Sequence, residues 1–262
     1  MKTGSPEPES VTRHGRGLFL LVLLLALGTG LWVMSLLWRR DLTVRQVYAS
    51  GNRIVSTSEL VRLANIPGGG RLSDVDLGAA RSRVLKNAFV RRASIHRDLP
   101  DRIEIRVEER EPVAALANER LMYVDADGVV LPPVRSEELF DLPVITGAPA
   151  LEQCTAGKAV THPAIREALR LILAAHSLNE AVYRRISEVH ILPGGDLMLY
   201  TAEFGVPVLV GRGDLVDKLV RLEGFWNTIV SSRGADALET IDIRFADQVV
   251  VRWEPTSQQQ LQ

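Results

Sequence analysis

The chain has 262 residues, of which 46% are hydrophobic and 24% are charged, so its composition is that of globular protein with room for one to three domains. Its formal net charge of −1 gives no general reason to expect nucleic acid as a partner. The single cysteine, Cys154, excludes an internal disulfide and a multi-cysteine metal site, and it is compatible with either side of a membrane.

A long apolar stretch near the N-terminus predicts a membrane anchor. Residues 18–38 include no charged side chain across 21 positions. As a helix they would be about 31 Å long, which matches the ~30 Å hydrocarbon core of a bilayer. A cleaved signal peptide would need a small-x-small site after its apolar region, and the residues that follow offer none. We therefore expect an uncleaved transmembrane helix, with Leu18 at one end and Trp38, Arg39 and Arg40 at the other.

Charge counting leaves the orientation of this helix open. Similar numbers of basic residues flank the span, namely Lys2, Arg13 and Arg16 before it and Arg39, Arg40 and Arg45 after it. Residues 1–17 are polar and rich in Pro, Gly and Ser, so we expect a flexible arm there. A short arm and a long remainder favour a signal anchor with the C-terminal bulk exported.

The next segment, residues 42–111, predicts an α+β unit. A strand is followed by a helix that Ser56 caps, then by a Gly-rich stop at residues 66–70. A second helix follows, for which we expect Ser73 as the cap. Two further strands flank a turn at residues 98–101. The order strand, helix, helix, strand, strand predicts a three-stranded sheet with two helices on one face.

Residues 112–254 predict a second unit, mostly antiparallel β-sheet with two helices. An Asp-Gly pair at residues 127–128 marks the tip of a hairpin. Amphipathic helices are expected at residues 162–176 and 214–230, with a three-strand meander between them. Two strands close the unit, and we expect residues 255–262 to form a disordered tail.

Charge is unevenly shared between these two units. Residues 41–112 carry 13 Lys and Arg against 10 Asp and Glu, whereas residues 113–254 carry 13 against 20. A basic unit beside the span suits membrane lipid with anionic headgroups as a partner. Unselected variation in surface charge explains the same bias equally well.

The sequence contains no recognisable reactive motif. The five histidines, including His162 and His190, form no metal-binding motif, and none lies near Cys154 in a nucleophile pattern. The Gly-rich residues 67–71 lack the Lys-Ser/Thr pair of a phosphate-binding loop, so we interpret them as a helix terminator. We expect no catalytic residue, cofactor, metal or small-molecule substrate, although a site assembled only by folding stays open.

The charged run at residues 108–111, which Pro112 stops, admits two interpretations: an acid–base site, or a joint between the two units. Pro112 cannot donate a ladder hydrogen bond and biases Glu111 toward extended backbone, which suits a change of chain direction. We favour a joint formed by Glu109, Arg110, Glu111 and Pro112. In this interpretation Glu109 and Arg110 set the angle between the units.

From about residue 44 to residue 254 the chain resembles the FtsQ/DivIB cell-division family, in which a POTRA domain precedes a β-domain. The matching motifs include GN at residues 51–52, LP at 99–100, EREPVA at 109–114 and IDIRF at 241–245. The last two are fairly specific in combination.

The resemblance implies a non-catalytic, single-pass inner-membrane protein at the division septum, with a cytoplasmic N-terminus and both folded units in the periplasm. Its partners would be FtsB/DivIC-like and FtsL-like bitopic coiled-coil proteins and, indirectly, the septal peptidoglycan synthase and transpeptidase. It would recruit these proteins and help to regulate septal peptidoglycan synthesis. The alternative is a membrane-anchored POTRA protein of envelope or outer-membrane protein assembly, although the second unit is small for that class.

The end of the chain is where we expect a partner to dock, because the family's partner site lies in this region. We expect the last strand, at a sheet edge, to consist of Gln248, Val249, Val250, Val251, Arg252 and Trp253. An unpaired edge accepts a partner strand through backbone hydrogen bonds, and Trp253 would anchor it. The alternative is that Val249 and Val251 belong to the core and that Trp253 only covers it.

Overall fold

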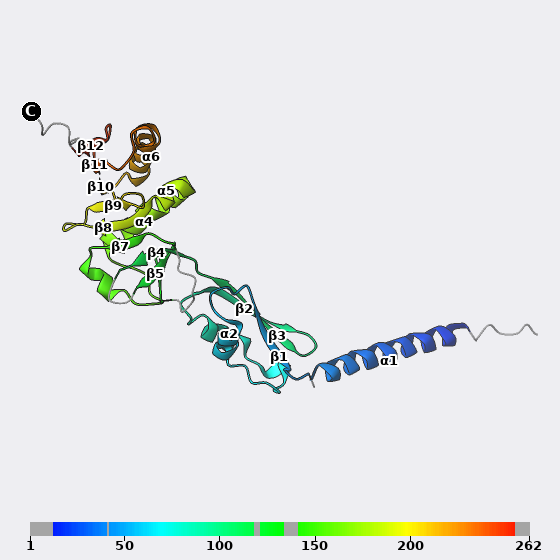
Figure 1. Cartoon of the computed structure of the whole chain (residues 1–262). Coiled ribbons are helices and arrows are strands. Elements are labelled where there is room, and N and C mark those ends of the chain that lie inside the picture. The colour runs from blue at the N-terminus through cyan, green and yellow to red at the C-terminus, as the bar shows by residue number, and fades with distance from the viewer. Residues whose placement is uncertain (1–12, 41, 118–120, 134–140, 255–262) are drawn as a thin grey trace, which may run out of the picture.

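The computed structural model describes the backbone of residues 13–40, 42–117, 121–133 and 141–254, which form a long N-terminal helix followed by two folded units (Figure 1). The helical elements are α1 (Arg13–Arg40), α2 (Thr57–Ala64), η1 (Leu72–Asp74), α3 (Leu77–Val84), η2 (Pro149–Gln153), α4 (Pro163–Leu178), α5 (Glu180–Arg184), α6 (Leu215–Phe225), η3 (Trp226–Val230) and α7 (Ser231–Arg233). The strands are β1 (Gln46–Ser50), β2 (Val90–Asp98), β3 (Arg102–Glu109), β4 (Pro112–Leu116), β5 (Met122–Asp125), β6 (Val130–Leu131), β7 (Val144–Thr146), β8 (Ile186–Ile191), β9 (Leu197–Thr201), β10 (Pro207–Gly211), β11 (Leu238–Asp242) and β12 (Val250–Trp253).

The first helix, α1, contains the stretch for which we expect a membrane span. Its backbone is helical from Arg13, so residues 13–17 of the predicted flexible arm belong to the helix instead, since no proline interrupts it there. Among the side chains that the structure describes, no helix is long and apolar enough to cross a membrane. Several predicted features lie outside the described side chains, namely Leu18, Trp38, Arg39, Arg40, the first part of the arm and the tail at residues 255–262.

The first unit has the predicted order of elements. Its strands are ordered β1–β3–β2, with β3 parallel to β1 and antiparallel to β2, and helices α2 and α3 pack on them. Ser56 caps α2 by accepting a hydrogen bond from the Glu59 amide, as predicted. The predicted cap of the next helix is wrong, because Ser73 lies in the separate turn η1. Asp76 caps α3 instead, accepting from the Ala79 amide at 2.9 Å.

The second unit is built on one nine-stranded sheet, ordered β12–β11–β10–β9–β8–β7–β4–β5–β6. Five of its neighbouring pairs are antiparallel, whereas β4–β7, β7–β8 and β10–β11 are parallel. The sheet is mixed because α4 and α6 return the chain between β7 and β8 and between β10 and β11, which allows a parallel neighbour. These two helices occupy the predicted positions, and the short α5, η3 and α7 add to them.

The main apolar core lies between the nine-stranded sheet and helices α4 and α6. It includes the fully buried side chains Leu116, Ile145, Ile165, Leu171, Ile172, Leu197, Leu199 and Leu219. The core of the first unit continues into the second, where Ala115, Tyr123 and Leu131 join it from the opposite face of β4, β5 and β6. The two units are therefore joined by apolar packing as well as by the chain.

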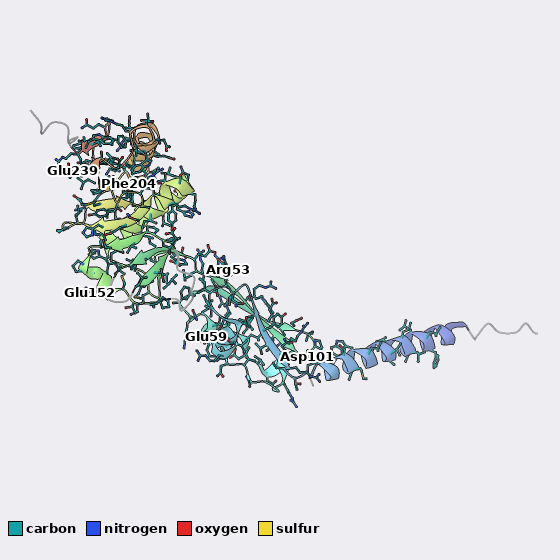
Figure 2. All side chains as sticks on the ribbon, viewed as in Figure 1. Arg53, Glu59, Asp101, Glu152, Phe204 and Glu239 are labelled. Atoms are coloured by element: carbon teal, nitrogen blue, oxygen red, sulfur yellow. The ribbon has the colours of Figure 1, made fainter. Side chains whose placement is uncertain are left out.

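The end of the sheet that carries β11 and β12 lies far from α1. In Figure 2, Asp101 lies beside the C-terminal end of α1, whereas Glu239 on β11 lies at the opposite end of the molecule. The first unit lies between these two ends (Figure 1). The fold therefore separates the β12 edge from the N-terminal helix by the length of both units.

Gly51, directly after β1, occupies a position that suits only glycine. Its φ of +81° lies in the left-handed region, and a Cβ there would overlap the carbonyl oxygen of Val107 on β3.

We expect Gly51→Ala to lower the free energy of unfolding by about 2–4 kcal/mol in urea denaturation. Gly69→Ala is the matched control, because Gly69 has φ +79° and open space around its Cβ position, so it should lose only about 1 kcal/mol. Equal losses would show that the contact with Val107 is unimportant.

Candidate interaction edge and interdomain joint

The nine-stranded sheet has two edge strands, β6 and β12, which differ in whether their outer backbone groups are paired. Those of β6 are paired. The Val130 amide donates to the Lys158 carbonyl at 2.9 Å, and the Val130 carbonyl accepts from the Gly157 amide at 2.7 Å. An isolated bridge between Val129 and Ala159 extends the same cover. Residues 157–160 therefore supply this edge with the backbone partners that an exposed edge strand lacks.

The other end of the sheet is β12, which is paired on one side only. It runs antiparallel to β11, with Val250 opposite Asp242 and Val251 opposite Ile241. Among the segments that the structure describes, none pairs with the outer side of β12. This strand therefore presents backbone donors and acceptors that another strand could pair with.

The predicted last strand is longer than the observed one. Gln248 and Val249 precede β12, because the pairing begins at Val250, opposite the last residue of β11. The Val250 side chain is 45% exposed. Val249 and Val251 are partly buried and pack against the main core, as the alternative interpretation expected for these two positions.

The last two residues of β12, Arg252 and Trp253, lie in different environments. The Trp253 ring is partly buried against the core and lies under the Arg233 guanidinium, 4.7 Å from the ring centroid. Arg252 is exposed and lies 3.6 Å from the Glu239 carboxylate on β11. Such an exposed pair contributes little to stability, whereas the arginine over the indole fixes the ring near the edge.

The connection from β11 to β12 is held by a local ion pair and by Arg221 on α6, which donates to the Phe245 carbonyl at 3.0 Å. Asp242 accepts hydrogen bonds from the Arg244 amide at 3.0 Å and from Arg244 Nη2 at 2.6 Å. The Arg244 guanidinium holds the pKa of the Asp242 carboxyl below its usual range. Because the folded pKa is lowered, this stabilisation is present at neutral pH and is lost only as the pH falls through that pKa.

The charged run at the joint divides its contacts between the two units. Glu109 turns back into the first unit, where its carboxylate accepts from the amides of Arg53, Ile54 and Val55 at 2.9, 2.7 and 2.9 Å. Three amide donors on one carboxylate fix the turn that precedes α2. Among the described residues, the Glu111 carboxylate makes only an exposed contact, with Arg53 Nη1 at 3.3 Å.

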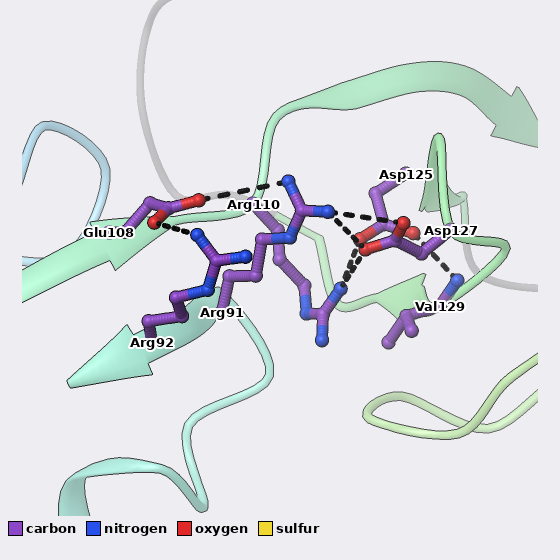
Figure 3. A network of polar contacts seen from close by, with 7 residues as sticks. All are labelled: Arg91, Arg92, Glu108, Arg110, Asp125, Asp127 and Val129. Carbon is purple, nitrogen blue, oxygen red and sulfur yellow. Dashed lines mark hydrogen bonds and ion pairs between the residues drawn. The ribbon is translucent and has the colours of Figure 1, made fainter.

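Arg110 faces the second unit (Figure 3). Its Nη1 lies 2.6 Å from Asp125 Oδ2 and 3.1 Å from Asp127 Oδ2, and its side chain is only 18% exposed. Asp125 is buried and also accepts from the Val129 amide at 2.7 Å. Arg91 on β2 adds a contact from the first unit to Asp127 at 3.1 Å. The arginines thus hold the β5–β6 turn against the end of the first unit.

Sequence reasoning identified Arg110 but missed its partners. Asp125 and Asp127 belong to the predicted hairpin, which we interpreted only as turn chemistry around Gly128. A carboxylate at the end of an apolar strand is the available signal, since a buried Asp requires a hydrogen-bonding or charged partner. Pro112 is the first residue of β4, where its missing amide disrupts the ladder least.

A polar cluster on β7 and β8 has the residue types of a hydrolase but not the arrangement. The Thr146 hydroxyl contacts the Glu188 carboxylate and lies 2.7 Å from His190 Nδ1, and that same nitrogen lies 3.5 Å from Glu188. A catalytic relay needs the acid on one ring nitrogen and the hydroxyl on the other. We therefore interpret the cluster as cross-strand pairing, in which Thr146 lies opposite His190.

We find no metal-binding site in the described part of the chain. Among those residues, no group of three or more His, Cys, Asp or Glu side chains is placed to hold a metal ion.

Arg110→Ala tests the joint. The substitution leaves the buried Asp125 carboxylate without its closest cation, so we expect a loss of about 2–4 kcal/mol in the free energy of unfolding. X-ray scattering should also show a broader distribution of interdomain orientations. Arg106→Ala is the control, because Arg106 is exposed and its one ion pair among the described residues is with Glu104, so its loss should be within about 1 kcal/mol. Unchanged scattering and stability in Arg110→Ala would contradict a role in setting the angle.

Comparison with known proteins agrees with this two-unit architecture. The family model described as POTRA domain, FtsQ-type, matches residues 42–110, and the model described as cell division protein FtsQ/DivIB, C-terminal, matches residues 113–244. The cell division protein FtsQ of Rhodothermus marinus is 33% identical over 88% of this chain and 87% of that protein. Those of Geotalea daltonii and Geobacter sp. are 30% and 31% identical, over 80% and 86% of this chain and 75% and 82% of those proteins. The chain thus belongs to the FtsQ/DivIB family of cell division proteins.

Proposed function

We propose that the chain is a non-catalytic, single-pass inner-membrane scaffold of the division machinery. In this proposal α1 anchors the protein, the N-terminus is cytoplasmic and both folded units are periplasmic. The second unit recruits and binds FtsB/DivIC-like and FtsL-like coiled-coil proteins at the septum. Through them the protein helps to regulate the septal peptidoglycan synthase and its transpeptidase.

The open β12 edge is the observation that carries the proposal. The β6 edge has its backbone groups paired by residues 157–160, whereas the outer side of β12 has no partner among the described residues. An edge that is left open, in a sheet whose other edge is paired, is a ready template for a strand of another chain. The family match ends at residue 244, so the support for β12 comes from its place in the sheet.

The side chains of β12 also suit a protein partner. Val250 is exposed on one face of β12, and Val251 and Trp253 are partly buried on the other, so apolar side chains flank the open backbone on both faces. Aromatic residues that are already fixed by packing lose little entropy on binding, and Arg233 holds the Trp253 ring. A partner strand would find both backbone pairing and an aromatic anchor.

The proposed anchor rests on the sequence of α1. Residues 18–38 carry no charge, α1 is a continuous helix through them, and its described apolar side chains from Phe19 to Met34 are exposed. A bilayer would cover such a surface. The cytoplasmic position of the N-terminus follows from the family's expected topology, because flanking charge does not decide it.

Val250→Glu tests the partner edge. A charge placed at the centre of the proposed contact should weaken binding of the purified FtsB/DivIC-like partner by at least roughly tenfold, as measured by titration calorimetry on the full chain. Val216→Glu on α6 is the matched control, because Val216 is 49% exposed on a helix, which offers no open strand edge. Equal affinities for both variants and the unmodified chain would sink the proposal.

Two further variants separate backbone pairing from anchoring. Backbone groups alternate along a strand, and the Glu254 amide donates to Ala237 on the β11 side, so the Val251 amide faces the open side of β12. Val251→Pro removes that amide, and Trp253→Ala removes the indole, so both should weaken capture of the partner. Circular dichroism must show that each variant stays folded. Full affinity in folded variants would place the partner site elsewhere.

A further inference from the structure

A second surface, at the opposite end of the molecule, has no role in the partner edge. The base of the first unit, which we define as residues 42–45, 67–71 and 99–101, is the part that follows α1 most closely. The Leu72 amide donates to the Leu42 carbonyl at 2.8 Å, so the chain is already part of the fold two residues after α1 ends at Arg40.

Backbone hydrogen bonds hold the three segments of the base together. The Val44 amide donates to the Gly70 carbonyl and the Arg45 amide donates to the Asp101 carbonyl, at 2.9 and 2.8 Å. The Arg97 guanidinium donates to the Leu72 carbonyl at 2.8 Å, which ties the β2–β3 hairpin to the turn η1. The base is therefore one rigid surface, and Asp101 lies beside the end of α1 (Figure 2).

The tip of the β2–β3 hairpin exposes an apolar side chain on this surface. Leu99 is 58% exposed and is followed by the exposed Pro100. The polar residues near it are mostly cationic or neutralised: Asp101 lies 3.6 Å from Arg45, and Asp98 lies 3.0 Å from Arg102. Arg71 is also exposed, and it forms no ion pair among the described residues.

We infer that the base of the first unit sits in the headgroup layer of the membrane, with Leu99 inserted at the boundary with the acyl chains. This inference rests on the proposed anchoring of α1. Two residues of chain span at most about 7 Å, which is close to the ~5–7 Å thickness of the headgroup layer on each side, so the chain holds the base at the membrane surface. Arg45 and Arg71 then lie at the level of the lipid phosphates, with their stems along the apolar boundary.

The consequence is that the membrane contacts the first unit at two places, the end of α1 and the hairpin tip. A single helix leaves a domain free to rotate about its connection, whereas a second contact restrains that rotation. The packed joint between the units would pass this restraint on to β12. The direction in which β12 faces is thereby defined relative to the membrane.

A fluorescent probe at position 99 tests the inference. The full chain carrying Cys154→Ser and Leu99→Cys is labelled with an environment-sensitive dye and reconstituted into phosphatidylethanolamine and phosphatidylglycerol nanodiscs. The matched control is Phe204→Cys in the same background, because Phe204 is 70% exposed at the far β9–β10 turn. The probe at 99 should emit at shorter wavelength than the probe at 204 and be quenched several-fold more by a lipid-attached nitroxide. Iodide in the water should quench it several-fold less.

The outcomes separate this inference from the proposed function. If the protein resists alkaline carbonate extraction but both probes report water, the anchor stands and the membrane contact of the base is wrong. If carbonate releases the protein, α1 is not an anchor and both fail. If the probe at 99 alone reports lipid, the inference holds, and Leu99→Asp in the unlabelled chain should then increase protease access to the β2–β3 turn.

Discussion

An open β-sheet has two edge strands, and the outer side of each carries backbone donors and acceptors without strand partners. In this protein the two ends differ: residues 157–160 pair with the β6 edge, whereas β12 is open among the described residues. Among the described residues, the β12 edge of the nine-stranded sheet is therefore the one at which a strand of another chain could pair. The helices α4 and α6 cover one face along the sheet and leave this edge accessible, so the candidate function follows from sheet order.

A usable edge also needs a defined position, and the joint supplies it. Apolar packing of Ala115, Tyr123 and Leu131 with the first unit is supplemented by Arg110, which contacts the buried Asp125. The neighbouring Glu109 fixes the turn before α2 within the first unit. Glu109 therefore stabilises the first unit, and the adjacent Arg110 stabilises its contact with the second. The charged run that suggested acid–base chemistry in the sequence instead holds the two units together. The proposed lipid contact at Leu99 would extend the same restraint to the membrane.

The sequence predicted the order of the first unit, because period-2 alternation, Gly-rich stops and caps such as Ser56 act locally. In the second unit it predicted the helices and most strands but not β4 and β7. Features that depend on distant segments were harder to predict. Parallel pairing of β7 with β8 requires knowledge of the route of the chain through α4, and the length of β12 depends on where β11 ends. The partners of Arg110 lie in a hairpin that we interpreted only through its Asp-Gly turn, so the burial of Asp125 was not predicted. Ser73 was mistaken for a cap because Asp76, three residues later, fits the same pattern.

The proposed function depends on β12 accepting a strand from a partner. Hydrogen–deuterium exchange of the full chain, with and without the FtsB/DivIC-like partner, tests it most directly because it reports backbone amides one segment at a time. Added partner should slow exchange in Val250–Trp253 while leaving the covered β6 edge unchanged. Slower exchange elsewhere in the second unit, with β12 amides unaffected by saturating partner, would contradict it.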